Sequence, residues 1–160
     1  MAKPKLPPPD SKPATDPTDD DALVRTHLAF GWWSLAAFTT LGLVLEAAHG
    51  VKLGWYLDLT NATRRLMFTL GHAHGTLLAL VNIAFAVSLR HANLSAVARG
   101  RASFALRAAT ILMPLGFLGG GIVFYAGDPG IAVVLVPPSA VLLVIGLVIF
   151  ARGFAAPSAK

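Results

Sequence analysis

The sequence predicts an all-α integral membrane protein, an up-down-up-down bundle of four transmembrane helices. The chain of 160 residues is 55% hydrophobic and only 13% charged, whereas soluble domains contain about 25% charged residues. It also contains four uncharged runs of 18 to 24 residues, and about 20 apolar residues are enough to cross a bilayer. The ends of these runs carry aromatic residues that favour the headgroup level of a membrane, namely Trp32, Trp33, Trp55, Tyr56 and Tyr125.

The uncharged runs define the expected helices. Helix-forming apolar segments are joined by short polar loops, so each helix is expected to lie antiparallel to the next. The expected transmembrane helices cover about 26–49, 66–89, 104–127 and 129–151, within a membrane domain of residues 23–152.

The segments outside and inside these runs have their own compositions. Residues 1–22 are rich in proline, aspartate and lysine and are predicted to form a disordered cytoplasmic tail, because they cannot bury enough apolar surface to fold. Residues 153–160 form a short C-terminal tail. Pro114, Gly119-Gly120-Gly121 and Pro137-Pro138 are expected to bend and pack the third and fourth helices.

The distribution of lysine and arginine predicts the orientation. Ten of these residues belong to the two tails and the second loop with its flanks: Lys3, Lys5, Lys12, Arg25, Arg90, Arg99, Arg101, Arg107, Arg152 and Lys160. Only Lys52, Arg64 and Arg65 belong to the opposite side. Because cytoplasmic loops carry the excess of positive charge, we expect a multi-pass protein of the cell (inner) membrane with both termini in the cytoplasm.

Composition also excludes several functions. Cysteine is absent, which excludes disulfides, zinc knuckles, cysteine-ligated haem and iron–sulfur clusters. The net charge of +5 comes from basic residues in loops beside the apolar runs. The sequence contains no basic face with interleaved aromatic residues, so nucleic-acid binding is not expected. The chain has no phosphate loop, nucleophile–base arrangement or dinucleotide motif, so no enzymatic activity is expected.

One acidic residue lies within the expected membrane region. Glu46 is one turn before the end of the first helix, and an ionisable group at that depth is a functional hypothesis by default. His49 follows three residues later and therefore lies on the same helical face. This Glu-x-x-His spacing is also used by carboxylate-bridged metal sites in helical bundles.

The second helix begins with two further histidines, His72 and His74. The antiparallel arrangement brings His72 to the same membrane depth as Glu46 and His49, toward the outer face. Residues two apart on a helix point about 200° apart, so only one of the two histidines is expected to face the first helix. The stripe of small and polar residues that contains His72 favours His72, and His74 is expected to face lipid or a third helix. The predicted metal ligands are Glu46, His49 and His72, with His74 in reserve.

Other polar residues receive simpler interpretations. Thr39 is expected in the polar stripe of the first helix that matches the second. Asn82 lies in mid-membrane, where such residues form interhelical hydrogen bonds. His27 and His91 flank Arg25 and Arg90, and both are expected to be solvated interfacial side chains.

The segment from Arg64 through His72-Ala73-His74 into Leu77–Leu80 resembles small uncharacterised bacterial membrane proteins in which a His-x-His opens the second of four helices. These are in turn similar to a fragment of the haem–copper oxidase subunit I superfamily, whose second helix carries a haem-ligating histidine. The resemblance covers residues 28–89 and implies an axial ligand at His72 or His74. The third and fourth helices contain no histidine, so a complete oxygen- or nitric-oxide-reducing centre is excluded, whereas a single haem or metal site, including one shared with a partner subunit, is not.

Three functions therefore remain open from the sequence. The leading one is a non-enzymatic membrane protein that holds haem, iron, copper or zinc in the histidine and glutamate cluster, since imidazole suits all three metals. The second is a structural or accessory subunit that binds no ligand and uses its glycine-rich third helix against a membrane-protein partner. The third is a proton- or ion-conducting homo-oligomer, because buried glutamate and histidine relay protons in transporters.

Overall fold

The computed structural model describes residues 19–155. In these residues four long helices account for most of the chain. They are connected by the loop of residues 51–62, two short 3₁₀ helices and one small hairpin. The elements in chain order are α1 (Asp19–Gly50), α2 (Thr63–Ser88), η1 (Leu89–His91), α3 (Ala96–Ile122), β1 (Phe124–Tyr125), β2 (Asp128–Pro129), η2 (Ile131–Leu135) and α4 (Val136–Ala155). All four α-helices, with η1 and η2 extending α2 and α4, are long and apolar enough to cross a membrane. The all-α prediction is confirmed except for this hairpin.

The helix boundaries differ from the expected ones for local reasons. α1 begins at Asp19, inside the expected tail of residues 1–22, because three aspartates at its start suit the positive end of a helix dipole. The third expected helix ends early, at Ile122, where the β1–β2 hairpin begins. α4 begins at Val136, which places both following prolines in its first turn, where a helix loses no hydrogen bond. The remaining predicted tail residues, 1–18 and 156–160, lie outside the described part.

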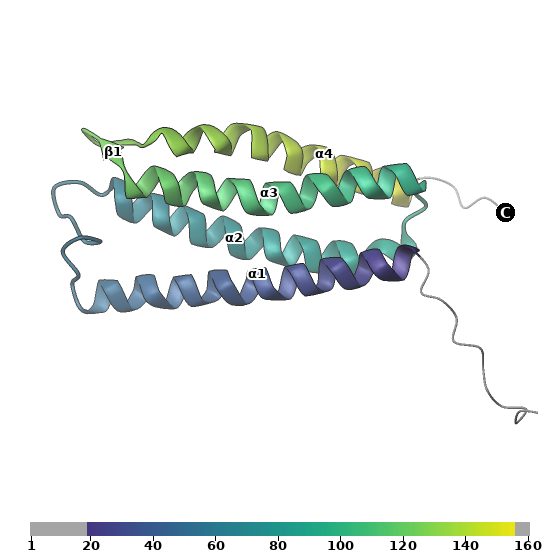
Figure 1. Ribbon diagram of the computed structural model, residues 1–160, viewed down its shortest axis with the longest axis horizontal. Helices are drawn as coiled ribbons and strands as arrows, with labels where there is room; N and C mark the ends of the chain where they lie inside the picture. Colours follow the sequence, from purple (N-terminus) through teal and green to yellow (C-terminus); the bar gives the residue numbers. More distant parts are fainter. Residues whose placement is uncertain (1–18, 156–160) are drawn as a thin grey trace, which may run out of the picture.

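Each helix packs mainly against the one before or after it in the chain, and neighbouring helices run antiparallel (Figure 1). We call one end of the molecule the hairpin end, because it carries the 51–62 loop and the β1–β2 hairpin. The other is the terminal end, where α1 begins and α4 finishes. The core cluster of Phe85, Leu89, Ala102 and Leu106 contacts residues of α1 and α4 as well, so all four helices meet there.

Glycines bring the helices close together. A side chain at Gly31 would overlap Ile83, and one at Gly75 would overlap Phe38, which explains how α1 and α2 approach so closely. Gly120 and Gly121 of α3 are buried against the segment after the hairpin and against α2. The glycine run of α3 is therefore covered by the chain itself and not left free for a partner.

Candidate functional site

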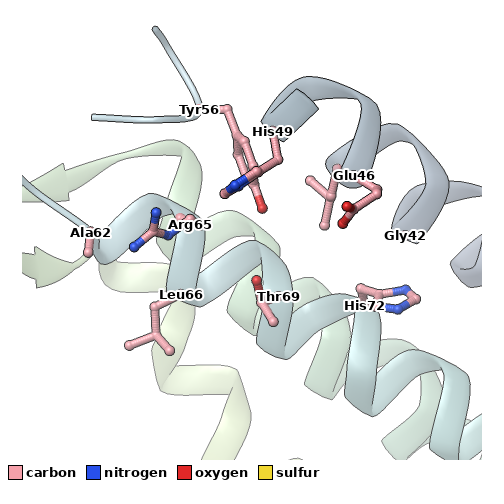
Figure 2. Close-up of a pocket in the computed structure, with 10 residues that line it drawn as sticks. Gly42, Glu46, His49, Tyr56, Ala62, Arg65, Leu66, Thr69 and His72 are labelled. Atoms are coloured by element: carbon pink, nitrogen blue, oxygen red, sulfur yellow. The ribbon is translucent and has the colours of Figure 1, made fainter. Parts of the chain in front are cut away.

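A cleft of about 510 Å³ opens between α1 and α2 at the hairpin end. It is lined by Gly42, Leu45, Glu46, His49, Tyr56, Ala62, Arg65, Leu66, Thr69 and His72. Figure 2 shows Glu46 on one wall and Thr69 and His72 on the opposite wall. Three of the four predicted ligands, Glu46, His49 and His72, therefore line the same cleft.

His72 is the most precisely held of these residues. Its Nδ1 lies 2.7 Å from the carbonyl oxygen of Phe38 on α1, and a carbonyl only accepts, so Nδ1–H donates. The imidazole packs directly on Gly42, where any side chain would overlap the ring. In the neutral ring, the lone pair is consequently on Nε2. A backbone carbonyl that fixes the tautomer in this way is the usual support of a metal-ligating histidine.

Glu46 and His49 are held less firmly. Both side chains are exposed, and both line the cleft from the last turns of α1. Within residues 19–155, no three histidine, aspartate or glutamate side chains are close enough together to hold a metal ion. A metal would therefore require the two flexible α1 side chains to turn toward His72.

Arg64 fixes the loop that closes the cleft. Its guanidinium donates to the carbonyl oxygens of Trp55 (2.6 Å) and Gly121 (3.2 Å) and lies 4.2 Å from the centroid of the Trp55 ring. These contacts hold the loop against the start of α2 and the end of α3. Tyr56, which follows Trp55, is thereby buried in the wall of the cleft. Sequence reasoning missed Tyr56 as a residue of the site, because the loop conformation depends on this long-range contact.

His74 is separated from the other three. Its Nδ1 donates to the carbonyl of Leu70 at 2.9 Å, and its ring centroid is 4.9 Å from that of Phe117 on α3. The prediction that His74 faces lipid or a third helix is therefore resolved in favour of α3. Thr39 is exposed on α1 and does not line the cleft, so its expected place in an inward stripe is wrong.

His27 was expected to be solvated, and this prediction is wrong. Its side chain is wholly buried, at 0% exposure, because α1 starts eight residues earlier and continues past it. Its Nδ1 is 2.9 Å from Asn82 Oδ1 on α2, and its Nε2 is 2.8 Å from Ser103 Oγ on α3. Asn82 also donates 2.8 Å to Thr110 Oγ1, so the expected interhelical bonding of Asn82 is present.

These four side chains form a closed polar network, defined as His27, Asn82, Ser103 and Thr110. Asn82 Nδ2 donates to the Leu78 carbonyl as well as to Thr110, which identifies Oδ1 as the atom facing His27. His27 Nδ1 must therefore donate, and in the neutral ring Nε2 accepts from Ser103. The Thr110 hydroxyl in turn donates a hydrogen bond to the Leu106 carbonyl oxygen. Every buried hydrogen-bonding group of Asn82 and His27 is thus satisfied, as a structural network requires.

Comparisons of the chain with protein-family models, curated proteins and solved structures give no match.

Proposed function

We propose that the protein is a multi-pass membrane protein of the cell (inner) membrane with both termini in the cytoplasm. The four apolar helices support this proposal. α1 and α4 expose large apolar side chains over much of their length, among them Leu43, Val44, Val141 and Val144, and lipid is the solvent that accepts such faces. With the basic termini inside, the cleft opens toward the outer face.

We further propose that this cleft binds a transition-metal ion through Glu46, His49 and His72. The observation that carries the proposal is the His72 ring, fixed by the Phe38 carbonyl with Nε2 as its free donor atom, in the cleft that both α1 ligands line. Two imidazoles and a carboxylate suit zinc, copper or iron. Because three ligands leave a position open, water or a partner's group completes the coordination.

The lining of the cleft favours an ion over haem. A porphyrin requires an extended apolar slot beside its axial histidine, whereas this cleft places the carboxylate of Glu46, the guanidinium of Arg65 and the hydroxyl of Thr69 among its apolar side chains. Haem would therefore require a partner subunit to supply the apolar wall.

Proton conduction by a single chain has less support. His72 and Asn82 are ten residues apart on α2, about 15 Å along the axis. The buried α2 residues between them, Gly75, Leu78 and Ala79, carry no proton. The hydroxyl of Thr76 is buried without a hydrogen-bond partner, so within residues 19–155 no chain of hydrogen bonds joins the cleft to the polar network. The cleft and the polar network are therefore separate features of the bundle.

The experiment is metal analysis of protein purified in detergent from metal-replete cells, with a visible spectrum of the same sample. We expect near-stoichiometric metal that is lost in His72→Ala and retained in His74→Ala, the matched control two residues away. Gly42→Ala retains every ligand but displaces the His72 ring, so it should also lose metal. Metal-free wild-type protein, or equal losses in the His72 and His74 variants, would contradict the proposal, and a Soret band would replace the ion with haem.

A further inference from the structure

A second hollow, separate from the cleft, runs between α1 and α3. This groove has a volume of about 420 Å³. Its walls are mainly apolar and include Trp33 and Ala37 of α1 and Ile111 and Leu115 of α3. None of the residues lining the cleft lines the groove. The groove is therefore a separate hollow from the cleft.

Arg107 lies beside the groove, toward the terminal end. It is one turn before Ile111 on α3, and its guanidinium carbon is 5.4 Å from the ring centroid of Phe30, which lines the groove. The side chain is exposed, and within residues 19–155 it forms no hydrogen bond or ion pair. The groove thus has an uncompensated positive charge at one mouth.

The position of Arg107 along α3 indicates where this mouth of the groove lies in the bilayer. Ile122, at the other end of α3, is 15 residues further on, or about 22 Å, so Arg107 lies within a hydrocarbon layer of about 30 Å measured from the hairpin end. A charge there is costly unless it reaches a polar group, and the flexible arginine stem extends toward the headgroups. Trp33, 78% exposed, lies nearby on α1 and suits the same interface.

We propose that the groove binds an anionic phospholipid of the leaflet at the terminal end, with the phosphate at Arg107 and one acyl chain along the apolar walls. From Arg107 and Phe30 the groove runs toward the hairpin end, which is also the direction from a headgroup to the bilayer midplane. The positive charge favours an anionic over a zwitterionic lipid. A second copy docked symmetrically on the groove would bring two Arg107 side chains together, and their repulsion disfavours that occupant. The inference rests on the proposed membrane placement but not on metal binding.

The test reconstitutes the full chain in bilayers of equal phosphatidylglycerol and phosphatidylcholine, and then counts retained lipids by native mass spectrometry. We expect the wild type to retain phosphatidylglycerol preferentially. Arg107→Gln should lower this preference about fivefold. Arg152 is also an exposed arginine at the terminal end, in the last turn of α4, and Arg152→Gln should leave the preference unchanged. Ala37→Phe fills the groove without changing charge and should lower retention of the bound lipid.

Three results would overturn the lipid site. The first is an equal loss in Arg107→Gln and Arg152→Gln, which would indicate general charge attraction. The second is unchanged lipid retention in Ala37→Phe. The third is a dimer that Ala37→Phe dissociates, which would make the groove a contact between copies. Zn²⁺ binding measured in the same three variants separates this result from the metal proposal, because none of the three substituted residues lines the cleft.

Discussion

The two ends of the helix bundle hold their histidines in opposite ways. At the terminal end, His27 is wholly buried and both ring nitrogens are hydrogen-bonded to side chains of other helices. At the hairpin end, His72 is half-buried in an open cleft, with Nδ1 bonded to a backbone carbonyl and Nε2 free for a ligand. His27 joins three helices, whereas His72 has the arrangement that we propose for a metal ligand.

This difference separates stability from function within one small protein. Four helices meet around the core cluster near the polar network, so changes there should weaken the fold. The cleft lies where α1 contacts mainly α2 and the loop, and Glu46 and His49 are exposed. Changes there should alter ligand binding with little effect on folding.

The largest expected effect is at the polar network. Asn82→Leu removes the acceptor of His27 Nδ1–H and leaves that donor buried, so the free energy of unfolding in detergent micelles should fall by about 2 kcal/mol. Thr39→Leu, an exposed position on α1, is the control and should change it by less than about 0.5 kcal/mol. Equal stability of Asn82→Leu and Thr39→Leu would contradict a structural role for the network.

The next effect concerns the loop that closes the cleft. Arg64→Ala removes the donor to the Trp55 and Gly121 carbonyls, so loop residues 51–62 should open more easily, by about 1–2 kcal/mol. Faster hydrogen exchange of the loop amides would report this change. Arg65→Ala, which removes a neighbouring positive charge, should leave that exchange slow, and fast exchange in both variants would mean that Arg64 does not hold the loop.

Changes within the cleft should have smaller effects on stability. Glu46→Gln and His49→Ala alter exposed side chains, so unfolding should change by less than about 0.5 kcal/mol, while Zn²⁺ affinity measured by calorimetry should fall at least tenfold. His91→Ala, an exposed histidine at the terminal end, is the control for nonspecific Zn²⁺ binding. If Glu46→Gln and His49→Ala lost much stability but kept their Zn²⁺ affinity, the cleft would serve the fold and not ligand binding.

The smallest expected effect is a pH response in the loop. The hydroxyl of Thr60, and to a smaller extent its backbone N–H, donate hydrogen bonds to the Asp58 carboxylate. Both lower the pKa of this carboxyl below the ordinary 3.8. The stabilisation is therefore present at neutral pH and is lost as the pH falls through this lowered value. Thr60→Ala should raise the Asp58 pKa in a carboxyl NMR titration, and an unchanged pKa would show that Thr60 is not its cause.

The four helices could be predicted from the sequence because each apolar run is long enough to be recognised as a helix that could cross a membrane. The sequence also predicted that Glu46, His49 and His72 share one level, since this follows from helix spacing and antiparallel packing. It failed for His27, because charge beside a histidine suggested solvent while the helix in fact begins well before it. The sequence did not decide between lipid and a third helix as the neighbour of His74. α2 packs against both α1 and α3, and periodicity alone does not show which of its faces contacts which helix.

The contrast between the two ends is tested most directly by NMR of the imidazole nitrogens in ¹⁵N-histidine-labelled protein during Zn²⁺ titration in micelles. We expect the signals of His72 Nε2 and of both His49 ring nitrogens to shift, while His72 Nδ1 keeps its proton and both nitrogens of His27 stay unchanged. Unchanged His49 and His72 signals, or equal shifts in His27, would contradict this expectation.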